Sequence, residues 1–207
     1  MKFNLIDLNN WERTEYYNHY LNNVVCSYSL TSNIDISNLE KKKLYPAMLW
    51  LLTATVNEIK EFRTSLEPKG IGIFESMHPS YTIFNKVNKN FSVIWTEYDE
   101  DYNVFLNRYN DDIIKYSSST KFLPKAGKPL NTFDVSMLPW ATFTSFNLNI
   151  HNNGKYLLPI FTMGKFFKNG KKTMLPLAIQ VHHSVCDGYH VGLFLEILQN
   201  KIENFIL

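Results

Sequence analysis

The stretch TMLPLAIQVHHSVCDGYHVGLFLEILQ, residues 173–199, carries the strongest structural pattern in this chain. Its first half alternates between two sets of side chains, as a β-strand requires. One set comprises Leu175, Leu177, Ile179, Val181 and His183, and the other comprises Pro176, Ala178, Gln180 and His182. Its second half repeats apolar residues at helical spacing, at Val191, Phe194, Leu195, Leu198 and, just beyond, Ile202. The stretch therefore predicts a strand, a turn and a helix.

The turn, HHSVCDGYH over residues 182–190, holds three histidines, an aspartate and a cysteine. A metal site is one interpretation, which we disfavour because neighbouring strand residues point to opposite faces and the HExxH spacing is absent. A structural interpretation makes His182 a satisfied core histidine and His190 an exposed side chain. It also makes Asp187 the cap of the helix and Gly188 a residue with positive φ.

His183 is the candidate general base of this turn. It extends an apolar strand face to the end of the strand, where an imidazole is partly desolvated beside a loop. A neutral imidazole is the group that accepts a proton near neutral pH. Asp187, four positions later, is expected to anchor the turn or to act as a proton partner.

The rest of the chain predicts helices and strands in alternation, and we expect a single α/β domain over residues 1–207. Helices are expected over residues 9–23, 44–62 and 101–117. Strands are expected over residues 27–37, 70–74, 80–84, 132–138, 142–151 and 157–167 as well as 173–182. Residues 117–132 are expected to form a surface loop.

Composition narrows the classes of function. The chain has 21 basic and 19 acidic side chains, a formal net charge of +2, which gives no large field for a nucleic-acid partner. No apolar run is long enough for a membrane span or a signal peptide. The two cysteines lie far apart in sequence, so we expect neither a disulfide framework nor a thiolate metal site, and we expect a reducing cytoplasm.

HHSVCDG matches the HHxxxDG pattern of CoA-dependent acyltransferases, and most of the chain resembles the chloramphenicol acetyltransferase family more closely. The stretches that carry the resemblance follow the order of that family and are residues 10–13, 24–36, 43–51, 79–84, 90–98, 133–150, 158–167 and 175–199. The resemblance implies a two-layer sandwich, with a mixed β-sheet covered by helices. It also implies a homotrimer with active sites at the subunit interfaces, and acetyl-CoA as cosubstrate without a metal.

The resemblance implies a role for five residues in acetyl transfer to a primary hydroxyl of chloramphenicol. His183 corresponds to the general base, and the hydroxyl then attacks the thioester directly, without an acetyl-enzyme. Ser136 corresponds to the serine that stabilises the oxyanion, and Thr162 to a threonine that assists through an ordered water. Asp187 and Arg13 correspond to a structural ion pair. From the residues alone, Ser136 is an ordinary polar strand residue and Arg13 a solvated helix residue.

The resemblance also implies two groups of binding residues. The acceptor pocket corresponds to Tyr20, Val24, Cys26, Tyr28, Thr82, Phe91, Leu123, Phe146, Leu148 and Ile150. Binding of CoA corresponds to Trp140, Lys165 and Phe166. From the residues alone, the aromatic members are core residues. His19, Val24 and Phe166 stand where other members can carry Phe, Leu and Tyr, so pocket shape and CoA contacts are expected to differ.

Two other functions stay open. One is a related acyltransferase that acts on another hydroxylated acceptor. The other is a catalytically silent relative that binds a hydrophobic ligand. The joint presence of the five catalytic-type residues favours the enzyme.

Overall fold

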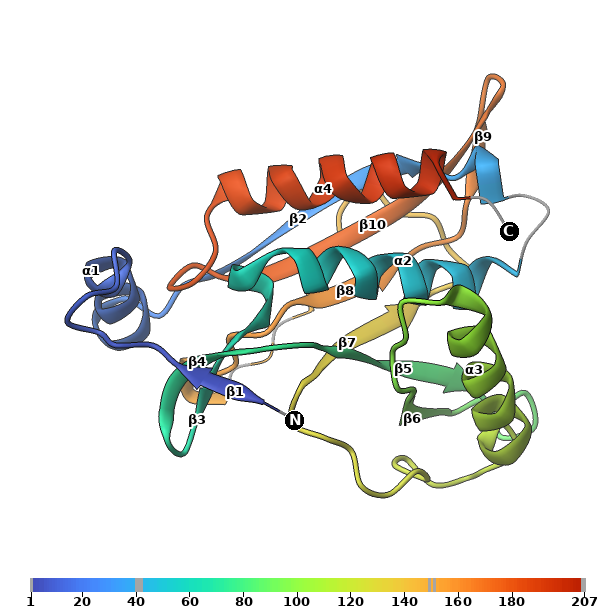
Figure 1. The fold of residues 1–207 in the computed structure, drawn as a ribbon. Helices are drawn as coiled ribbons and strands as arrows, with labels where there is room; N and C mark the ends of the chain where they lie inside the picture. Colours follow the sequence, from blue (N-terminus) through green and yellow to red (C-terminus); the bar gives the residue numbers. More distant parts are fainter. Residues whose placement is uncertain (1, 40–42, 149, 151, 206–207) are drawn as a thin grey trace.

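The computed structural model describes residues 2–39, 43–148, 150 and 152–205. Over these residues the chain is a mixed α/β fold with a large and a small β-sheet (Figure 1). The strands of the large sheet are β2 (Ser27–Asp35), β5 (His78–Phe84), β6 (Phe91–Trp95), β7 (Thr132–Met137), β8 (Ile160–Met163), β9 (Phe167–Asn169) and β10 (Lys172–His182). The strands of the small sheet are β1 (Phe3–Leu5), β3 (Thr64–Glu67) and β4 (Gly70–Phe74). The α-helices are α1 (Thr14–Asn18), α2 (Leu44–Glu58), α3 (Tyr102–Tyr116) and α4 (Gly188–Glu203).

The large sheet is mixed, with the strand order β2–β10–β8–β7–β5–β6, and β9 pairs with β10. Strands β5, β7 and β8 run parallel to one another, whereas β10 is antiparallel to both β2 and β8. The ladder between β10 and β2 runs from Met174 opposite Asp35 to His182 opposite Ser27. Strand β10 therefore lies inside the sheet, and its C-terminal end leads into the HHSVCDG turn.

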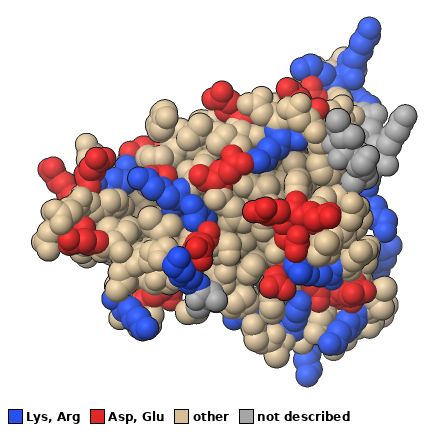
Figure 2. Space-filling view, viewed as in Figure 1, with Lys and Arg blue, Asp and Glu red and all other residues tan. Residues whose placement is uncertain are grey.

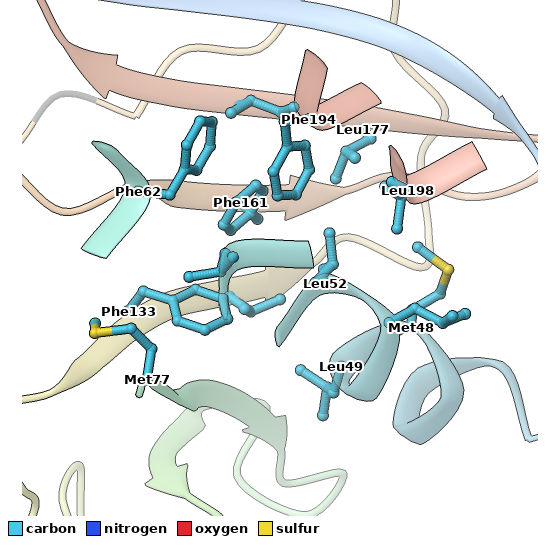
Figure 3. Close-up of a cluster of buried hydrophobic side chains, with 14 of the residues drawn as sticks. Met48, Leu49, Leu52, Phe62, Met77, Phe133, Phe161, Leu177, Phe194 and Leu198 are labelled. Carbon is cyan, nitrogen blue, oxygen red and sulfur yellow. The ribbon is translucent and has the colours of Figure 1, made fainter. Parts of the chain in front are cut away.

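The core lies between the large sheet and the helices that cover one of its faces (Figure 1). In Figure 3, side chains from α2, α4 and the strands meet in one cluster. The ring of Phe194 on α4 stacks on Phe62 at 4.8 Å and on Phe161 of β8 at 5.1 Å between centroids. Leu177 and Leu52 are fully buried in the same cluster. Burial of these side chains from water stabilises the sheet–helix sandwich.

The opposite face of the large sheet carries the alternate side chains of the same strands. Val135, Phe161 and Ile179 point to the helices, so their neighbours Ser136 and Thr162 point away from them. From the segment that follows β7, Phe146 and Leu148 lie beside Thr162 on this outer face. The side chains of Ser136 and Thr162 are therefore on a face that no α-helix covers in the described residues.

The structure confirms most of the expected elements. Residues 173–199 form the expected strand, turn and helix, and the expected strand over 27–37 is β2. Pro46 lies in the first turn of α2 and is buried, as expected. The expected helix over 101–117 is α3, with Asp101 as its N-cap accepting a hydrogen bond from the Asn103 N–H at 2.8 Å.

Two expected elements are wrong. The first helix begins at Thr14 and not at residue 9, because the carboxylate of Asp7 accepts hydrogen bonds from Asn9 and Asn10 and closes a turn there. The strand expected over 142–151 is absent from the described part of that segment, which excludes positions 149 and 151. Phe146 and Leu148 of this segment lie against Thr162 on the face of the sheet, where they pack on side chains and form no ladder. Strands β1, β3 and β6 were not expected from the sequence.

The surface carries mixed charge on the face seen in Figure 2, where acidic and basic side chains are interspersed over the helices. None of the helices in the described residues combines the length and the apolar composition that crossing a bilayer requires.

Candidate active site

His183 follows the last residue of β10, and its backbone continues the ladder by donating to the Cys26 carbonyl at 2.9 Å. Its Nδ1 lies 3.1 Å from the carbonyl oxygen of Cys186 and 3.3 Å from Oδ1 of Asp187. Both oxygens only accept, so Nδ1 carries the proton of the neutral imidazole. The lone pair is then on Nε2, which is the form that a general base needs.

Two tyrosines hold the imidazole of His183. The ring of Tyr20 stacks on it at 4.2 Å, and the ring of Tyr28 meets it edge-on at 5.4 Å. The His183 side chain nevertheless stays 30% exposed, so Nε2 can be reached by a ligand. Burial raises the pKa of the Tyr28 phenol, whose hydroxyl has no hydrogen-bond partner in the part of the chain that the structure describes.

Arg13 and Asp187 form the ion pair that secures the turn. The Arg13 guanidinium donates to the two carboxylate oxygens of Asp187 at 2.5 and 2.9 Å, in a bidentate arrangement. It also donates to the carbonyl oxygens of His183 at 3.2 Å and Ser184 at 3.4 Å. Hydrogen bonds from Arg13 hold the pKa of Asp187 below its ordinary value, so the carboxylate stays ionised. Arg13 therefore links the carboxylate of Asp187 to the backbone carbonyls of His183 and Ser184.

Ser136 and Thr162 form a second polar centre. They lie opposite each other on the parallel strands β7 and β8, and their hydroxyl oxygens are 2.9 Å apart. Thr162 is buried, whereas Ser136 is partly exposed on the outer face. A hydroxyl fixed by a buried partner is a preorganised hydrogen-bond donor for a charge that develops beside it.

Three of the ten predicted acceptor residues lie near this second centre. Thr82 lies on the outer face of β5, one strand from Ser136, and Phe146 and Leu148 line a small cavity with Thr162. The backbone N–H of Phe146 donates to Thr31 Oγ1 at 3.3 Å, which fastens this segment over β2. The remaining members, Phe91, Leu123 and Ile150, are 53%, 58% and 38% exposed.

The other predicted acceptor residues lie with His183 instead. Tyr20 and Tyr28 contact its ring, and Cys26 accepts its backbone N–H. Val24 ends the π-helical turn over His19–Asn23 and is 53% exposed.

The residues predicted to bind CoA lie near the end of β8. The N–H of Lys165 donates to the Ala141 carbonyl at 2.8 Å, and Trp140 packs edge-on against Phe84 at 4.7 Å. The side chains of Trp140, Lys165 and Phe166 are all exposed.

The two centres do not meet within one chain. Thr162 is opposite Ala178 on β10, and His183 lies five residues further along. Five residues of strand span roughly 16 Å, and Ser136 is one strand further away. Nε2 of His183 and the hydroxyl of Ser136 therefore cannot contact the same small reacting group in a single copy.

Three features of the HHSVCDGYH stretch differ from the structural interpretation of the sequence. Gly188 is the first residue of α4 and is not among the positive-φ residues, because the turn closes before it. His190 is not an exposed side chain: its Nδ1 accepts the Asp187 N–H at 2.9 Å, and its side chain is 15% exposed. His182 is buried and its Nδ1 contacts Ser184 Oγ, but its Nε2 has no hydrogen-bond partner among the described residues.

Sequence reasoning missed His190 and its neighbour Glu61. An acceptor side chain three residues after an N-cap aspartate has the spacing of a capping box, and this signal could have identified His190. Glu61, which comes from a distant 3₁₀-helix, had no such signal.

Within the described residues, no three His, Cys, Asp or Glu side chains are grouped as a metal ion would require. Both cysteines are free, and burial raises the pKa of the Cys186 thiol.

Comparisons with known proteins agree on one family. A family model described as chloramphenicol acetyltransferase matches residues 1–199. A chloramphenicol acetyltransferase of Clostridium perfringens is 50% identical over 212 residues, covering 99% of this chain and 97% of the relative. One of Campylobacter coli is 49% identical over 205 residues, covering 98% of this chain and 99% of the relative. A solved chloramphenicol acetyltransferase superposes with a TM-score of 0.86 at 23% identity, over 96% of this chain and 99% of that one, which shows a shared fold.

Proposed function

This chain belongs to the chloramphenicol acetyltransferase family, and from that membership we propose that it transfers the acetyl group of acetyl-CoA to a primary hydroxyl of chloramphenicol, which inactivates the antibiotic. The observation that carries the proposal is the fixed tautomer of His183. Its Nδ1 proton is held by the Cys186 carbonyl, and its Nε2 is left free to accept a proton.

In the proposed reaction, Nε2 of His183 takes the proton of the acceptor hydroxyl. The hydroxyl oxygen attacks the thioester carbonyl, so a carbon–oxygen bond forms and the carbon–sulfur bond breaks. The CoA thiolate leaves and takes the proton back from His183. No acetyl-enzyme is needed, because both substrates are bound together.

Ser136 is proposed to donate a hydrogen bond to the carbonyl oxygen as negative charge develops on it. Support comes from the 2.9 Å contact with Thr162, which restricts the rotation of the serine hydroxyl. Thr162 is proposed to assist through an ordered water. A donor of this kind is typically worth about 100-fold or more in rate.

The active site is proposed to lie between copies of the chain in a homotrimer. The separation of His183 from Ser136 supports this, since a neighbouring copy can bring its own Ser136 and Thr162 to His183. Two buried polar atoms that lack a hydrogen-bond partner in residues 2–39, 43–148, 150 and 152–205 also support a covered outer face. They are Nε2 of His182 and Oε1 of Gln180. When each copy contacts the next through two different surfaces, the copies form a closed ring if the rotation between neighbours divides a full turn evenly.

The acceptor is proposed to lie against the apolar side chains around both centres, with the CoA chain entering beside Trp140, Lys165 and Phe166. Mostly apolar walls with a few polar groups suit a nitrophenyl antibiotic. The two free cysteines support a reducing compartment, and we place the enzyme in the cytoplasm.

The test mixes purified protein with acetyl-CoA and chloramphenicol and follows the release of thiol. Release that depends on chloramphenicol, with acetylated antibiotic as product, is expected. Release with other alcohols but not with chloramphenicol would assign a different acceptor. No release with any alcohol, from a protein that binds chloramphenicol, would favour a silent relative.

A further inference from the structure

We propose that His190 is a positioning residue for acetyl transfer, which fixes the tautomer and orientation of His183 through a single shared peptide group. The proposal deepens the proposed function and rests on it. His190 lies on the first turn of α4 and does not touch the proposed reacting atoms.

The shared peptide group joins Cys186 to Asp187. Its carbonyl oxygen accepts the Nδ1 proton of His183 at 3.1 Å, and its N–H donates to Nδ1 of His190 at 2.9 Å. In a trans peptide the C=O and N–H point in opposite directions within one plane, so the two histidines lie at opposite edges of that plane. Rotation of this plane therefore displaces both hydrogen bonds together.

The direction of these hydrogen bonds fixes both tautomers. Nδ1 of His190 accepts, so its imidazole is neutral and its proton is on Nε2. That Nε2 faces Oε1 of Glu61 at 3.7 Å, and the two side chains are 15% and 13% exposed. A nearby carboxylate stabilises a proton on Nε2 and so keeps Nδ1 as an acceptor.

The four groups therefore form one polarised series, in which the charge of Glu61 faces His190 and two hydrogen bonds join His190, the peptide and His183. Aligned hydrogen bonds through one peptide strengthen each other, and the nearby carboxylate polarises them in the same direction. The peptide carbonyl becomes a better acceptor for the His183 proton, which leaves Nε2 as the free base. Arg13 contacts the carboxylate of Asp187. The backbone N–H of Asp187 donates to Nδ1 of His190 and to no other acceptor in the described residues.

The experiment compares three variants of the full-length protein. His190→Leu removes the acceptor and keeps most of the side-chain volume. His190→Asn places an amide oxygen near the position of Nδ1 and restores the acceptor. His78→Leu is the matched control, since Nδ1 of His78 likewise accepts a backbone N–H, that of Tyr98 at 3.0 Å, at another part of the fold.

We expect His190→Leu to lower kcat by about tenfold or more while KM for both substrates changes little, because a small displacement of a catalytic group costs up to about 100-fold. His190→Asn is expected to recover most of the activity. His78→Leu is expected to lower the melting temperature as His190→Leu does but to keep kcat. Equal kcat in wild type and His190→Leu, or equal losses in all three variants, would overturn the proposal.

A second measurement does not depend on turnover. Nitrogen NMR of histidine-labelled protein reports which ring nitrogen of His183 carries the proton. In the wild type we expect the Nδ1–H form, and in His190→Leu a mixture with the Nε2–H form. An unchanged His183 spectrum would contradict the proposal. If chloramphenicol is not acetylated at all, the proposed function fails, yet this spectrum still tests the role of His190.

If His190→Leu does not fold, Glu61→Gln provides the same test with a smaller change. It keeps the acceptor on His190 and removes only the negative charge beside Nε2. A decrease in kcat without a change in KM is expected, and unchanged kcat would contradict the polarised series.

Discussion

The hydroxyl oxygens of Ser136 and Thr162 lie 2.9 Å apart across two parallel strands of the large sheet. Ser136→Ala removes the proposed donor and leaves the buried Thr162 in place. We expect kcat to fall by about 100-fold or more, since one oxyanion donor has this value in other enzymes. Steady-state kinetics measures the loss. Ser118→Ala, at an exposed loop serine, is the control, and a similar loss there would argue against the assignment.

His183→Ala is expected to abolish turnover and to leave the fold intact. General-base catalysis contributes about 100-fold to 10,000-fold, and Nε2 of His183 is the proposed base. Thiol release measures turnover, and gel filtration with circular dichroism checks that the assembly is unchanged. Retained turnover in His183→Ala would contradict the assignment of His183 as the general base.

Mixing two inactive variants tests whether the active site is shared. His183→Ala and Ser136→Ala, unfolded together and refolded at equal concentrations, place an intact His183 opposite an intact Ser136 in some sites. In a ring of three with random assembly, about one quarter of the sites are restored. Activity near that fraction is expected, whereas each variant refolded alone stays inactive. Absence of any recovery would place both residues in the site of one chain.

Asp187→Asn tests the ion pair with Arg13 as a function of pH. Arg13 lowers the pKa of Asp187 in the folded state, so the pair stabilises the fold at pH values above the ordinary aspartate range. This contribution is lost as the pH falls through the lowered pKa. We expect the variant to be less stable by about 1 kcal/mol at pH 7, since the carboxylate is partly exposed. The difference in the free energy of unfolding between wild type and Asp187→Asn should narrow below about pH 4.

Denaturant unfolding at both pH values measures this difference in the free energy of unfolding. Glu75→Gln, in the exposed pair with Lys2, is the control and should change stability little at either pH. A difference for Asp187→Asn that stays constant down to pH 3 would show that the ion pair does not cause it.

Lys125→Met tests a buried ion pair far from His183. Lys125 contacts both carboxylate oxygens of Asp112 at 2.7 Å and lies over the ring of Trp95 at 4.2 Å. Removing the lysine leaves a buried carboxylate unpaired, which costs about 3–5 kcal/mol. Denaturant unfolding is expected to show this loss, and Lys125→Met combined with Asp112→Asn should recover part of it. Lys2→Met, in an exposed pair, should change stability by less than about 1 kcal/mol.

The sequence predicted those parts of the fold that depend on local periodicity. Strand alternation separated His182 from His183, and helical spacing located α2, α3 and α4. Strands β1 and β3 have only three and four residues, too few for a periodic pattern to be read. The segment 142–151 has the composition of a strand, but it lies on the face of a sheet, and composition does not reveal whether a pairing edge is near.

The residues of the site and one of its contacts were predictable. Resemblance to a family assembled Arg13, Ser136, Thr162, His183 and Asp187 and implied the ion pair of Arg13 with Asp187, but not the contacts of His183. That Ser136 is far from His183 follows from the strand order, which places two other strands beside β10. The peptide shared by His183 and His190 depends on the direction of one carbonyl, and no pattern of side chains encodes that direction.

The position of β10 also has a consequence for synthesis of the protein. This strand pairs with β2 and β8, yet it leaves the ribosome after every other strand of the large sheet in the described residues. Until residue 182 has emerged, β2 and β8 each lack the neighbour that β10 provides, and such edges favour pairing with other chains. The large sheet is therefore completed only after residue 182 has emerged. A chain truncated before residue 172 would lack β10, and we expect chaperones to bind it and proteases to degrade it.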